Sequence, residues 1–73
     1  MVEGSQIDNT NHGNNKDGLV AELSDFNTAV NCALDFAEKD KNTLVIVVAD
    51  HDTGGLSIIN GDLNKKQFEI GWT

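Results

Sequence analysis

The sequence predicts an α/β fold in which parallel strands are linked by one long helix, and two observations favour this fold class. Residues 44–49, LVIVVA, are all apolar and mostly β-branched, as in a strand that is buried on both faces of a parallel sheet. Ahead of this run, apolar residues recur at intervals of three and four from Leu19 to Ala37. That spacing is typical of one face of an amphipathic helix.

The composition limits the chain to one small acidic domain. Seventy-three residues form at most a single unit, residues 1–73, with a marginal core. Cys32 is the only cysteine, so no disulfide forms within the chain, and we expect it to be a small packed thiol. The net charge of -7 argues against nucleic acid and anionic membrane surfaces as partners and suits divalent cations, although a solvated acidic surface explains it equally well. No run reaches membrane-spanning length, and no signal-peptide pattern is present.

The elements are expected in the order strand, helix, strand. Residues 1–6 are interpreted as the last turn of a strand, and the Asn-, Asp- and Gly-rich residues 7–18 as a loop. A short helix then precedes a longer one from about Asp25 to Asp40, with Ser24 or Asp25 as its N-cap. The strand at 44–48 follows directly. Together these elements would form half of a right-handed βαβ unit.

Two weaker strands are expected after Gly55, at residues 56–59 and 67–72, as edge strands or as an excursion from the main sheet. Asn60-Gly61-Asp62 is a turn signal between them. The strand at 44–48 needs cover on both faces, and the chain offers one substantial helix. We therefore expect the chain to be a piece of a larger protein, because an open face would leave a large apolar patch in water.

The two histidines each follow an aspartate closely, in the couples Asp8/His12 and Asp50/His51. In a βαβ unit both couples lie beyond the carboxyl ends of neighbouring parallel strands, so they would converge on one edge of the sheet, and Glu3 could point to the same place. Such donors suit zinc, with magnesium near the carboxylates. Taken singly, these residues also fit as turn, cap or solvated loop residues. The spacing alone therefore predicts no more than a possible metal-binding rim.

Two separated motifs resemble those of alkaline phosphatases. The first is VEGSQID at residues 2–8 with His12 four residues later, and the second is NTLVIVVADHDTGG at residues 42–55. The segment between them is similar to the family's connecting helix, and IGWT at residues 70–73 is similar to the lead-in to a further family histidine. VEGSQID favours a phosphatase over the related mutases and phosphodiesterases. The resemblance implies a C-terminal-half fragment of the family's three-layer fold.

The resemblance also implies a role for each candidate ligand. Glu3 matches the magnesium-binding glutamate, Asp8 and His12 match ligands of a first zinc, and Asp50 and His51 match ligands of a second zinc. The implied reaction is two-metal phosphoryl transfer from a phosphate monoester through a covalent phosphoserine. The implied parent enzyme is a homodimer that is periplasmic or secreted.

The chain lacks counterparts of several family groups. These are the serine nucleophile, the aspartate that bridges the second zinc and magnesium, a magnesium-binding Thr or Ser, the third ligand of the first zinc and any phosphate-binding arginine, since the chain contains no arginine at all. We therefore expect the isolated chain to be inactive and to hold zinc weakly. The alternatives are a stand-alone, non-catalytic cation-binding or interaction module, or a relative that acts on diesters or sugar phosphates.

Overall fold

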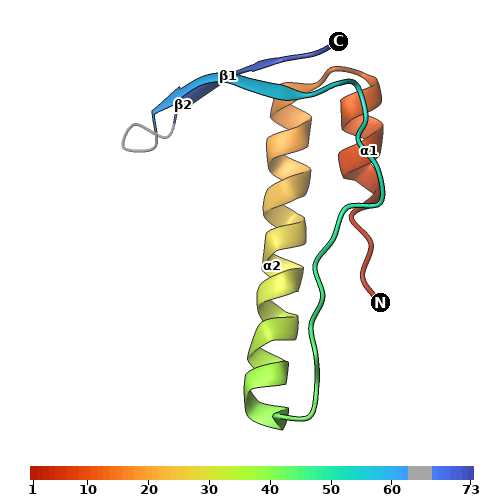
Figure 1. Ribbon diagram of the computed structural model, residues 1–73, viewed down its shortest axis with the longest axis vertical. Coiled ribbons are helices and arrows are strands. Elements are labelled where there is room, and N and C mark those ends of the chain that lie inside the picture. The colour runs from red at the N-terminus through yellow and green to blue at the C-terminus, as the bar shows by residue number, and fades with distance from the viewer. Residues whose placement is uncertain (63–66) are drawn as a thin grey trace.

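The computed structural model describes residues 1–62 and 67–73, and these residues form two helices followed by one β-hairpin (Figure 1). The elements in chain order are α1 (Ser5–His12), α2 (Lys16–Asp40), β1 (Ser57–Asp62) and β2 (Gln67–Gly71). Helix α1 packs against α2, and the chain returns from the far end of α2 towards α1 before it enters the hairpin (Figure 1). The α/β class is therefore confirmed at the level of a fragment.

Helix α1 lies where a strand end and a loop were expected, so the interpretation of residues 1–6 and 7–18 is corrected. Gly4 precedes the helix and lies close to α2, because a Cβ on Gly4 would be 3.1 Å from Cδ2 of Phe26. Asp8 lies in the first turn and His12 in the last turn, an arrangement that the helix dipole favours. The short polar segment is helical because it packs on α2, which its composition does not reveal.

Helix α2 is one continuous helix of 25 residues instead of a short helix followed by a longer one. Its N-cap is Asn15, whose Oδ1 accepts a hydrogen bond of 3.0 Å from the backbone N–H of Gly18. Ser24 does not begin a new helix, since it lies inside α2, where its carbonyl accepts a hydrogen bond of 3.2 Å from the Thr28 hydroxyl. Cys32 is exposed, so the prediction of a packed thiol is wrong.

The apolar segment at residues 44–49 is extended, but it has no strand partner among the described residues, so the predicted parallel strand is not formed (Figure 1). Its side chains are almost all exposed: Val45 is half-buried, whereas the exposed fractions of Leu44, Ile46, Val47 and Val48 are 83%, 71%, 55% and 79%. The hydrogen bonds of a strand are made to neighbouring strands, and this part of the molecule supplies no neighbour. The segment instead runs back beside α2 (Figure 1).

The two weaker strands are confirmed as the antiparallel pair β1 and β2, which form a sheet of their own. Ser57 lies opposite Gly71 and Asp62 opposite Gln67, with a bulge between Ile58 and Asn60. The predicted turn at residues 60–62 is wrong because these residues belong to β1. Residues 63–66, between the strands, lie outside the described residues.

The buried interior of the described chain is small. Leu19 is its one buried hydrophobic residue and Asn11 its one buried polar residue. The chain exposes 6029 Å², whereas a compact monomer of this size would expose about 4,400 Å². Its radius of gyration is 14.5 Å, against about 11 Å for a compact domain. These dimensions agree with the expectation that the chain's apolar segments need further cover.

Candidate metal centre

Helix α1 holds the first Asp/His couple. Asp8 and His12 are four residues apart, so they lie on the same face of the helix one turn from each other. Nε2 of His12 is 3.3 Å from Oδ2 of Asp8, and both side chains remain accessible to solvent. The helical conformation of residues 5–12 therefore creates this couple, where a strand end and loop had been expected to do so.

The second couple follows the extended apolar segment. Nε2 of His51 is 3.8 Å from Oδ2 of Asp50, and the Asp50 side chain is 91% exposed. Immediately afterwards the chain turns at Gly54 and Gly55, which have φ angles of +75° and +60°. Glycine adopts such angles without steric cost, so this is where the backbone can turn towards the hairpin.

Thr53 connects the two couples. Its hydroxyl donates a hydrogen bond of 2.5 Å to Oδ1 of Asp8, 45 residues away in the sequence. The same oxygen lies 3.2 Å from Nδ1 of His51. The structure therefore brings Asp8 and His51 together without the parallel sheet that was expected to do so. Thr53 was missed from the sequence, where the available signal was a hydroxyl two residues after His51.

The contacts shift two pKa values in opposite directions. The hydrogen bond from Thr53 is the main reason that the pKa of Asp8 lies below its usual range, and the nearby His12 and His51 add to this effect. The pKa of His51 is raised, first by the backbone carbonyl of Asp52 and then by the carboxylate of Asp50. Both shifts stabilise the charged form of the group.

The distance between the two potential metal-binding atoms suits a tetrahedral ion in the first couple and is slightly too long in the second. Two ligands each about 2 Å from such an ion lie about 3.3 Å apart. The Asp8/His12 couple has a donor separation of 3.3 Å, and the more exposed Asp50/His51 couple is slightly wider at 3.8 Å. No group of three or more His, Cys, Asp or Glu side chains that could hold a metal occurs among residues 1–62 and 67–73. Each couple can thus offer two ligands, fewer than a full coordination shell.

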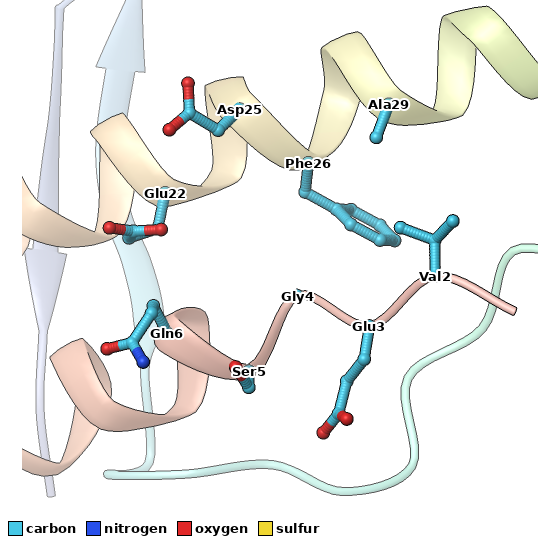
Figure 2. A pocket seen from close by; sticks show the side chains of 9 residues that line it. All are labelled: Val2, Glu3, Gly4, Ser5, Gln6, Glu22, Asp25, Phe26 and Ala29. Carbon is cyan, nitrogen blue, oxygen red and sulfur yellow. The ribbon is translucent and has the colours of Figure 1, made fainter.

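Glu3, the remaining predicted ligand, lies apart from the couples. It borders a shallow depression between the N-terminal segment and α2, which Glu22 and Asp25 also line (Figure 2). The Glu3 side chain points away from α2, so the three carboxylates do not converge (Figure 2). No hydrogen bond or ion pair within the described part of the chain joins Glu3 to Asp8 or His51.

Comparison with known proteins identifies the family. The alkaline phosphatase family model matches residues 1–69, and the chain belongs to this family. It is 57% identical to alkaline phosphatase 3 of Bacillus subtilis over 58 residues, which is 80% of this chain and 13% of that protein. It is 54% identical to alkaline phosphatase 4 of the same organism over 65 residues, 88% of this chain and 14% of that protein.

The similarity extends to other bacteria. The alkaline phosphatase of Escherichia coli K12 is 52% identical over 51 residues, which is 70% of this chain and 11% of that protein. The chain thus spans only about an eighth of the length of the curated relatives it matches. No solved structure matches the chain. Neither described helix combines the length and the apolar character that crossing a bilayer requires.

Proposed function

We propose that this chain is the segment of a phosphate-monoester hydrolase that supplies zinc and magnesium ligands for two-metal phosphoryl transfer. The observation that carries the proposal is the pair of contacts by which Thr53 joins Asp8 to His51. These contacts bring together two Asp/His couples from distant parts of a chain that belongs to the alkaline phosphatase family. When bound, the zinc ions supply positive charge beside the phosphoryl group that is transferred.

The ligands divide into three sets. Asp8 and His12 would hold the first zinc, Asp50 and His51 the second, and Glu3 the magnesium. The donor spacing of the first couple suits zinc directly, whereas the second couple must close slightly, which its exposed side chains permit. Two protein ligands for each ion hold zinc weakly. The remaining ligands, the serine nucleophile and a phosphate-binding arginine would come from other parts of a homodimeric enzyme that is periplasmic or secreted.

A zinc titration of the 73-residue chain tests the ligand assignment. We expect weak binding that decreases when either couple is disrupted, in the variants His12→Ala and His51→Ala. Asp35→Ala is the matched control, because it removes an exposed carboxylate from α2 and should leave zinc binding unchanged. A wild-type chain that binds no zinc, or histidine variants that bind as the wild type does, would refute the assignment.

The alternative is a stand-alone, non-catalytic module that binds a cation or a partner chain. The exposed side chains of Leu44, Ile46 and Val48 favour it, because they form an apolar surface without cover. The coding sequence on either side of this segment distinguishes the two functions. An open reading frame that encodes the family's serine and arginine supports the hydrolase, and unrelated flanking genes support the module.

A further inference from the structure

We propose that Thr53 is a positioning residue that links the two Asp/His couples and leaves Oδ2 of Asp8 and Nε2 of His51 free for cations. This inference rests on the proposed function, since it concerns how the proposed ligands are oriented. Three contacts at this point of the chain share no atom with the proposed ligand positions. The Thr53 hydroxyl contacts Oδ1 of Asp8 and Nδ1 of His51, and Nδ1 of His51 also lies 3.2 Å from the backbone oxygen of Asp52.

The direction of each hydrogen bond follows from the donors available. An ionised carboxylate only accepts, so the single hydroxyl proton of Thr53 must go to Asp8. The Thr53 oxygen can then only accept from His51, which requires a proton on Nδ1. The carbonyl of Asp52 is also an acceptor and independently requires the same proton. Two contacts therefore favour the same tautomer of neutral His51.

This tautomer leaves Nε2 of His51 without a proton, so its lone pair is free to bind a metal ion. Nε2 is also the His51 atom that faces Oδ2 of Asp50. On the other side of Thr53, Oδ1 of Asp8 is occupied, and Oδ2 is the atom that faces Nε2 of His12. In the first couple, Thr53 leaves free the Asp8 oxygen that faces His12. In the second couple, it leaves free the His51 nitrogen that faces Asp50. Hydrogen bonds that orient ligands in this way raise metal affinity.

The backbone after Thr53 holds it near α1. A Cβ on Gly54 would lie 2.9 Å from the backbone oxygen of Asn11, which leaves no room for a larger residue at this φ of +75°. The carbonyl of Gly54 also accepts a hydrogen bond of 2.8 Å from the backbone N–H of Thr73. The turn is thus packed between α1 and the end of the hairpin. Its position places the Thr53 hydroxyl at Asp8.

Four chains test the inference: the wild type, Thr53→Val, Thr53→Ser and Thr43→Val. Valine keeps the shape of threonine without the hydroxyl, and serine restores the hydroxyl. Thr43→Val is the matched control, because it removes another Thr–Asp hydrogen bond, of 2.7 Å to Asp40. Zinc affinity is measured by competition with a chromophoric chelator. The His51 tautomer is measured by ¹⁵N NMR of the metal-free chain above the pKa of His51.

We expect Thr53→Val to weaken zinc binding about tenfold or more, as for other groups that orient metal ligands. Thr53→Ser and Thr43→Val should stay near the wild-type affinity, and wild-type His51 should carry its proton on Nδ1. Circular dichroism checks that helicity is kept, and Thr53→Ala replaces Thr53→Val if it is not.

Three results would overturn the inference while the proposed function stands. These are zinc binding by the hydroxyl-free variant equal to that of the wild type, a loss in Thr53→Ser as large as in Thr53→Val, or a wild-type His51 protonated on Nε2. A wild-type chain that binds no zinc would instead remove the proposed function, and the inference with it.

Discussion

The hydroxyl of Thr53 donates a hydrogen bond of 2.5 Å to the carboxylate of Asp8, although 45 residues separate them in the sequence. This bond ties the first helix to the turn that follows the extended apolar segment. Through the same hydroxyl, Asp8 and His51 become neighbours.

The first prediction concerns the acid titration of Asp8. Its pKa lies below the ordinary value of 3.8, with the Thr53 hydrogen bond as the main cause. The stabilisation from this contact is therefore fully present above the ordinary pKa and is lost as the pH falls through the depressed value. We expect Thr53→Val to raise the pKa of Asp8, as measured by ¹³C NMR of its carboxyl carbon. Thr28→Val removes a hydroxyl that bonds to the Ser24 carbonyl, and it should leave the titration of Asp8 unchanged.

The second prediction concerns the pH dependence of zinc binding. The pKa of His51 is raised above 6.5, so its contribution to stability is fully present below 6.5 and is lost as the pH rises through the raised value. Zinc requires the neutral imidazole and competes with the proton. We expect zinc affinity to increase through that pH range and to level off above it, while the Cε1 proton of His51 reports the pKa by NMR. An affinity that does not change with pH would contradict this.

The third prediction concerns the start of α2. The Asn15 side chain accepts a hydrogen bond from the backbone N–H of Gly18. Its replacement in Asn15→Ala should cost about 1 kcal/mol of helix stability, seen as lower helicity by circular dichroism. Asn15→Asp keeps the acceptor and should retain the helicity. Asn27→Ala, at an exposed position inside α2, is the control and should not reduce it.

The fourth prediction concerns cooperativity and solubility. Leu19 is the one buried hydrophobic residue of the described chain, so we expect gradual thermal unfolding without a sharp transition. The uncharged, mostly β-branched segment at residues 44–49 should promote self-association. Ile46→Lys places a charge on its exposed face and should reduce light scattering without loss of helicity. A sharp melt of a metal-free monomer would contradict the prediction.

The fifth prediction concerns activity. The chain contains no arginine and no match to the family's serine nucleophile, so the pure 73-residue protein should not hydrolyse an aryl phosphate with zinc and magnesium present. Release of the chromophoric alcohol is the measurement. Turnover that depends on zinc and disappears in His51→Ala would show that this prediction is wrong.

Local patterns in the sequence predicted part of this fold correctly. The apolar spacing predicted a helix in the region of α2, and the two short segments after Gly55 were predicted as strands and form β1 and β2. The helix in the polar segment Ser5–His12 could not be predicted in this way, because it depends on packing against α2. The strand predicted at residues 44–48 is not formed here, since a strand requires a hydrogen-bonded neighbour.

The sequence by itself determined the two Asp/His couples, the net charge and the family, because these depend on residue identity and order. Only the tertiary structure decided that Asp8 and His51 meet at one hydroxyl, and that Asp8 and His12 share a face of a helix. The physical reason is that a contact across 45 residues depends on how α1 and the glycine turn pack together. No periodicity within either segment records that packing.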